Sequence, residues 1–93
     1  MCYYLYMHNK TEIIAKCLRA RFRTSMILLR GLGKKDIDLL IVSDDFGGYP
    51  MISRQRMVDS LGINNLDCIC LTNQEYSDIS GREMFPDEKF KAL

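Results

Sequence analysis

The sequence predicts a small α/β (α+β) domain, a mixed β-sheet of about three strands with helices packed on it. Short apolar runs typical of buried strands alternate with segments whose apolar residues recur at helical spacing. The first two runs lie about five residues apart, too close for a crossover, so they should pair as an antiparallel hairpin. A helical segment separates the second and third runs, which allows a right-handed parallel crossover.

The length and composition indicate one folded domain, with a core over about residues 9–80 and a tail over residues 81–93. Hydrophobic residues make up 47% and charged residues 27% of the 93 positions, as in ordinary folded proteins. The net charge of +1 gives no strong field for nucleic acid. The apolar start, "MCYYLYM", is too short to span a bilayer and has no signal-peptide pattern, so we expect a cytoplasmic protein.

The first helix is expected to begin at Asn9, which with Glu12 has the pattern of an N-terminal cap. Its expected buried stripe comprises five residues at helical spacing: Ile13, Ile14, Cys17, Leu18 and Phe22. Cys17 and the other cysteines, Cys2, Cys68 and Cys70, match no zinc or redox spacing, and we expect them to be reduced, packed thiols.

The next segments predict the hairpin and the crossover. Strands are expected over residues 25–30 and 36–43, joined by a glycine-containing turn. The loop "SDDFGGYP" leads to a helix over residues 51–61, ended by Gly62. A third strand is expected over residues 66–71. Thr72 and Glu75 then form a capping box for a short helix through Ile79. The segment after it is a tail or one or two further helical turns.

Three acids are the candidate chemical groups. Asp36 and Asp38 are two residues apart in a predicted strand, so their side chains share a face. Asp67 begins the third strand, and a parallel arrangement brings it to the same end of the sheet. Carboxylates gathered at one point suit Mg²⁺ and the two-metal chemistry of phosphoryl or nucleotidyl transfer. The alternative is that these acids are solvent-facing turn residues.

The stretch "DIDLLIVSDDFGGYPMISRQRMVDSLGINNLDCICLTNQEY" resembles the nucleotidyltransferase domain of the DNA polymerase beta superfamily. It is most similar to the minimal versions that include the antitoxins of nucleotidyltransferase–HEPN pairs. The similarity covers roughly residues 9–80 and is densest over "DIDLLIVSDDF". The resemblance implies that Asp36, Asp38 and Asp67 bind two Mg²⁺ ions and catalyse transfer of a nucleoside monophosphate from an NTP to a hydroxyl. It also matches Gly31 to the glycine of a phosphate-holding Gly-Ser turn.

The sequence departs from that family in the phosphate loop. Leu32 stands where the family has serine, and too few residues separate Gly31 from Asp36 for the usual helical turn. Gly33, Lys34 and Lys35 are candidates to hold phosphate instead, through close backbone approach and positive charge. The alternative is a plain hairpin turn with solvated lysines.

Two other functions stay open. One is a catalytically inactive, antitoxin-like module that binds a partner, either a HEPN-like toxin or a second copy of the chain. Its candidate contact residues are the aromatic ones, some of which could equally be core: Tyr3, Tyr4, Tyr6, Phe46 and Tyr49. The other, nucleic-acid binding, ranks last because the basic residues come without an aromatic RNA-binding motif: Arg19, Arg21, Arg23, Arg30, Lys34 and Lys35.

Overall fold

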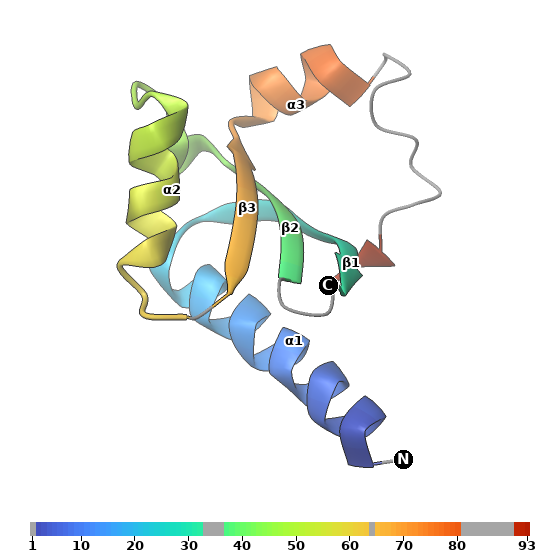
Figure 1. The fold of residues 1–93 in the computed structure, drawn as a ribbon. Helices are drawn as coiled ribbons and strands as arrows, with labels where there is room; N and C mark the ends of the chain where they lie inside the picture. Colours follow the sequence, from blue (N-terminus) through green and yellow to red (C-terminus); the bar gives the residue numbers. More distant parts are fainter. Residues whose placement is uncertain (1, 33–36, 64, 81–90) are drawn as a thin grey trace.

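The computed structural model describes residues 2–32, 37–63, 65–80 and 91–93 (Figure 1). The elements are α1 (Cys2–Arg21), β1 (Thr24–Leu32), β2 (Ile37–Ser43), the 3₁₀ turn η1 (Asp44–Phe46), α2 (Met51–Asp59), β3 (Leu66–Leu71), α3 (Asn73–Ser80) and β4 (Lys91–Ala92). The sheet has the order β3-β2-β1-β4. This confirms the predicted fold class: the three expected strands are present, and the two-residue β4 is added at one edge.

The strand directions agree with the predicted connections. β1 and β2 are antiparallel, and Leu32 pairs with Ile37, so only residues 33–36 connect them. β2 and β3 are parallel, with α2 in the crossover between them (Figure 1). β4 is antiparallel to β1 and pairs with Leu28 and Leu29. No helix within the described part of the chain is long and apolar enough to cross a membrane.

The first helix begins earlier than predicted. α1 starts at Cys2, and Asn9 lies inside it instead of capping it. The preceding residues contain no glycine or proline, and an asparagine inside a helix lowers its stability only slightly, so nothing in this segment forces a break. The side chains of Tyr3, Tyr4 and Tyr6, in the first two turns of α1, are outside the described set.

The buried face of α1 also differs from the prediction. Ile13 is 60% exposed and Cys17 is exposed, although both were assigned to the core stripe. Ile14, Leu18 and Phe22 are buried as predicted, and among the α1 side chains that the structure describes Thr11 and Ala15 are buried beside them. At 100° per residue, Ile13 points almost opposite to the buried residues, and Cys17 lies about 120° from their centre. Either of the adjacent residues Ile13 and Ile14 could have been the buried one, and the packing of α1 against the sheet determined that it is Ile14.

The hydrophobic core lies between α1, α2 and one face of the sheet, the inner face. Ile37, Leu39 and Ile41 of β2 form the middle of this face. Neighbouring strands contribute Ile27 and Leu29 from β1 and Leu66, Cys68 and Cys70 from β3. Burial raises the pKa of the Cys70 thiol to about 12, partly offset by the charge of Arg54. Both β3 cysteines are free thiols, so they pack as small apolar groups, as predicted.

The "SDDF" segment supplies one core side chain and hydrogen bonds to the backbone before β1. Phe46 is fully buried and packs on Phe22 with ring centroids 5.0 Å apart, so of the two alternatives left open for it, contact residue or core, it is core. Buried Ser43 donates a hydrogen bond to the Arg23 carbonyl at 2.9 Å and accepts one from the Asp45 N–H at 3.1 Å. The Asp45 carboxylate accepts from the Arg23 N–H at 2.7 Å.

Arg54 connects three elements around the end of β3. This residue of α2 is only 6% exposed. Its guanidinium donates to the Tyr49 carbonyl at 2.8 Å, to the Cys70 carbonyl at 3.0 Å and, at 2.6 and 3.2 Å, to the two carboxylate oxygens of Glu75. Glu75 also accepts from the Thr72 N–H at 2.8 Å, while the Thr72 hydroxyl accepts from the Glu75 N–H at 3.2 Å. The predicted capping box is therefore confirmed, and it is fastened to α2 by a bidentate ion pair.

The Glu75 pair predicts a specific acid response. The Arg54 hydrogen bond, followed by that of the Thr72 N–H, lowers the Glu75 pKa from its ordinary value of 4.5 to about 2. Because the folded-state pKa is the lower one, the stabilisation is complete above about pH 4.5 and is lost as pH falls toward 2. Urea unfolding of wild type and Glu75→Gln should therefore show a stability difference at pH 7 that shrinks between pH 5 and 2. A difference that is constant over this range would contradict the assignment.

Candidate functional site

The face of the sheet turned away from α1 and α2, the second face, carries two of the three predicted acids, Asp38 and Asp67. Strand pairing places its residues in rows across β1, β2 and β3: Met26 with Val42 and Leu71, Leu28 with Leu40 and Ile69, and Gly31 with Asp38 and Asp67. Two rows are apolar, and Leu40, Val42 and Leu71 are almost fully buried. The third row is acidic and lies at the end of the sheet where β2 and β3 begin.

Asp38 and Asp67 are direct cross-strand neighbours. The parallel register pairs their Cα atoms, so their side chains leave the same face of adjacent strands. Adjacent strands lie about 4.8 Å apart, a spacing at which two carboxylates can contact one cation. Asp38 is half-buried and Asp67 is exposed, so the pair has one sheltered and one solvent-accessible member. The parallel crossover predicted that Asp67 comes to the same end of the sheet as Asp38; the structure adds the register that makes them neighbours, and the metal-binding role itself stays a prediction.

The other predicted site residues fall mostly in the hairpin connection. Asp36, Gly33, Lys34 and Lys35 lie outside the described residues. Within the described ranges, no three His, Cys, Asp or Glu side chains gather closely enough to hold a metal ion. The described part of the site is therefore a pair of carboxylates, Asp38 and Asp67. Asp36, the third predicted acid, precedes Asp38 by two positions in the sequence.

Gly31 is the β1 member of the row that contains the carboxylate pair. The β1–β2 register shifts between Leu29 and Gly31, and this irregularity brings Gly31 opposite Asp38. Bulges of this kind often re-aim residues next to functional sites. The short 33–36 connection has no room for a phosphate-binding helix, however, so this part of the family pattern is not reproduced.

Burial and nearby carboxylates act together on the thiol of Cys68, next to Asp67. The pKa of the Cys68 thiol is raised well above its usual value, first by burial, then by Cys70, and then by the carboxylates of Asp67, Asp59 and Asp38. These acids therefore lie near enough to Cys68 to disfavour its thiolate form.

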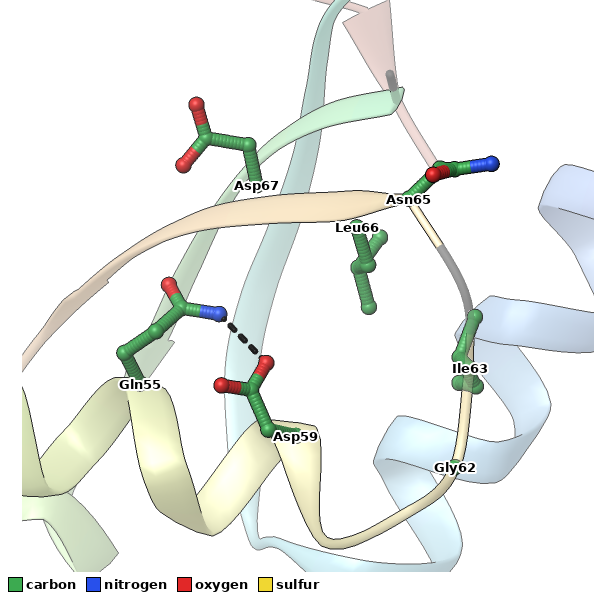
Figure 2. A pocket seen from close by; sticks show the side chains of 7 residues that line it. All are labelled: Gln55, Asp59, Gly62, Ile63, Asn65, Leu66 and Asp67. Carbon is green, nitrogen blue, oxygen red and sulfur yellow. Dashed lines mark hydrogen bonds between the residues drawn. The ribbon is translucent and has the colours of Figure 1, made fainter. Parts of the chain in front are cut away.

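An open depression of about 490 Å³ lies beside Asp67, at the edge of β3 (Figure 2). Its lining residues come from α2, the following loop and the start of β3: Gln55, Asp59, Gly62, Ile63, Asn65, Leu66 and Asp67. Gln55 and Asp59 lie one helical turn apart on the α2 face that borders β3, whereas the Asp67 carboxylate is on the other side of the β3 ribbon (Figure 2). Sequence reasoning missed Gln55 and Asp59; their i, i+4 spacing beside the predicted parallel strand was the available signal.

Comparisons with known proteins give two similar structures. No protein-family model matches the sequence, and a search of curated proteins gives no match. A provisionally assigned nucleotidyltransferase from Sulfolobus solfataricus has a TM-score of 0.67 and 19% identity, covering 95% of this chain and 79% of that one. A Bol-like protein from Babesia bovis has a TM-score of 0.62 and 25% identity, covering 76% of this chain and 92% of that one.

These similarities establish a nucleotidyltransferase-like fold. The Sulfolobus protein is similar over nearly the whole chain, which agrees with the resemblance carried by "DIDLLIVSDDF". The Babesia protein carries a different name on a similar arrangement, so the fold alone does not select an activity. The activity has to be argued from the carboxylate pair and its surroundings.

Proposed function

We propose that the chain is a Mg²⁺-dependent nucleotidyltransferase that moves a nucleoside monophosphate from an NTP to a hydroxyl acceptor: the acceptor oxygen loses its proton and bonds to the α-phosphorus, and the α–β phosphoanhydride bond breaks to release pyrophosphate. The observation that carries this proposal is the register pairing of Asp38 with Asp67. A parallel sheet has two faces and many possible registers. Two acids in adjacent positions on the same face are what shared metal binding requires.

The donor set suits the metal. Mg²⁺ commonly binds one or two carboxylates and fills its remaining positions with water and substrate phosphate oxygens. Asp38 and Asp67, joined by Asp36, would hold the ions. When bound, Mg²⁺ neutralises phosphate charge and makes a coordinated hydroxyl more acidic. Exposed Asp67 can then orient the acceptor hydroxyl, while half-buried Asp38 anchors the site on the rigid central strand.

The proposal is tested by paramagnetic broadening with Mn²⁺ in amide NMR spectra, with ATP and without it. We expect the amide signals of Asp38, Asp67 and their strand neighbours to broaden first, at submillimolar to millimolar Mn²⁺. Added Mg²⁺ should compete and restore them. The amides of α3, including Asp78, serve as the internal control. An absence of selective broadening at β2 and β3 in millimolar metal would overturn the proposal.

The second candidate, an inactive partner-binding module, is favoured by a different observation. The 33–36 connection cannot supply a phosphate-binding helix, and three exposed apolar residues lie together in sequence at the start of α2: Tyr49, Met51 and Ile52. A HEPN-like toxin or a second copy would cover such residues. This candidate replaces the first if metal and ATP leave the Asp38 and Asp67 signals unchanged.

A further inference from the structure

Gln55 is held in a fixed orientation at the edge of β3. Its Oε1 accepts a hydrogen bond from the Cys68 N–H at 3.3 Å, and its Nε2 donates to Asp59 Oδ1 at 2.9 Å. The first bond satisfies an outward-pointing backbone group of the edge strand, and the second connects neighbouring turns of α2. The side-chain amide therefore cannot flip without losing both bonds.

The Gln55–Asp59 pair presents a donor beside an acceptor. An amide nitrogen carries two N–H groups, and only one is directed at Asp59 Oδ1. A carboxylate has two oxygens and about four lone-pair positions, so Asp59, an exposed residue, keeps acceptor capacity. A ligand that pairs with both groups must itself offer an acceptor next to a donor.

The volume and lining residues of the depression further restrict which class of ligand it can bind. Its volume of about 490 Å³ is within the usual range for small-molecule sites. Ile63 and Leu66 provide apolar surface, and no basic residue is among those that line it. Phosphate is therefore disfavoured, whereas a neutral ring with a polar edge fits. Asp67 lines the depression and also belongs to the carboxylate pair, so both lie at the same edge of the sheet.

We propose that this depression binds the nucleobase of the nucleotide substrate, with Gln55 and Asp59 pairing to the donor–acceptor edge of the base. The inference rests on the proposed function, since it assigns the base of the same nucleotide. Adenine and cytosine each carry an exocyclic amino donor next to a ring-nitrogen acceptor, which complements the pair. Uracil carries a ring N–H donor next to a carbonyl acceptor, so it complements the pair as well.

The test is a titration of the whole chain with adenosine, cytidine, uridine and ribose 5-phosphate, without metal, followed by amide NMR. We expect adenosine, cytidine and uridine to shift the Gly62, Ile63 and Asn65 backbone signals and the Gln55 side-chain signals saturably, and ribose 5-phosphate to leave them unchanged. Asp59→Asn should weaken adenosine binding about tenfold, as expected for losing a charged acceptor.

A matched control comes from α3. Gln74 donates to Asp78 at 3.0 Å in the same i, i+4 arrangement, away from the depression, so Asp78→Asn should leave nucleoside binding unchanged. Equal weakening in both variants, equal shifts from ribose 5-phosphate, or no nucleoside shifts at the depression would each overturn the inference. The proposed function is tested by a separate measurement, the Mn²⁺ broadening of the Asp38 and Asp67 amide signals. Each proposal can thus fail without the other.

Discussion

Replacing Arg54 with methionine should lower the free energy of unfolding by about 2–3 kcal/mol, because a buried acceptor left without its donor costs about 1–3 kcal/mol, while the Glu75 side chain is 36% exposed and partly solvated. Arg54 is 6% exposed, and its guanidinium bonds to Glu75 and to the carbonyls of Tyr49 and Cys70. Methionine keeps the side-chain length but leaves these acceptors unmatched at the junction of α2, β3 and α3. Urea unfolding at pH 7, followed by circular dichroism, measures the loss.

The control for this variant lies two positions away on the same helix. Arg56 is exposed, so Arg56→Met should change stability by less than about 0.5 kcal/mol. The double variant Arg54→Met/Glu75→Gln should recover part of the loss, because the glutamine no longer leaves a carboxylate without its cation. Equal effects of Arg54→Met and Arg56→Met would show that Arg54 is not the connection described above.

Asp38→Asn should reduce divalent-metal affinity about 100-fold or more and remove measurable nucleotidyl transfer. Loss of a residue that only supports a metal ligand typically costs 10–100-fold in affinity or activity, and a direct ligand should cost at least as much. The substitution keeps the size of the side chain and removes one charge of the pair. Mn²⁺ titration gives the affinity, and transfer of labelled nucleotide from ATP to a hydroxyl acceptor gives the activity.

Two further variants separate metal binding from general electrostatics. Asp67→Asn should have an effect similar to that of Asp38→Asn, because the two carboxylates are neighbours across the strands. Asp78→Asn removes the same charge from exposed α3 and should leave metal affinity within about twofold of wild type. If the three variants behave alike, net charge explains the result and the metal assignment is wrong.

Several elements could be predicted from the sequence because short-range chemistry decides them. β3 has the predicted ends, 66–71, since six strand-forming residues lie between a turn and a capping box. The capping box of Thr72 and Glu75 has both of its hydrogen bonds, because its partners are three residues apart. The parallel β2–β3 pairing followed from the length of the connection.

Other features depended on contacts between distant residues. The "SDDF" match was read as a family signature, whereas the structure uses Ser43 and Asp45 to bind the backbone before β1 and Asp44 to bind the Asn73 N–H at 3.1 Å. Nothing local in the sequence names Arg23 or Asn73 as partners. The depression at Gln55 and Asp59 likewise exists only because α2 packs beside the edge of β3.

The sequence by itself determined the order of strands and helices, the hairpin, the crossover and the acids that could bind a metal. These follow from periodicity, connection length and residue chemistry, all of which act over a few positions. Tertiary structure decided which side of α1 is buried, that Phe46 is core, and that Asp67 stands beside Asp38. A one-residue change in register would have turned Asp67 to the other face, and only the packing of both sheet faces sets that register.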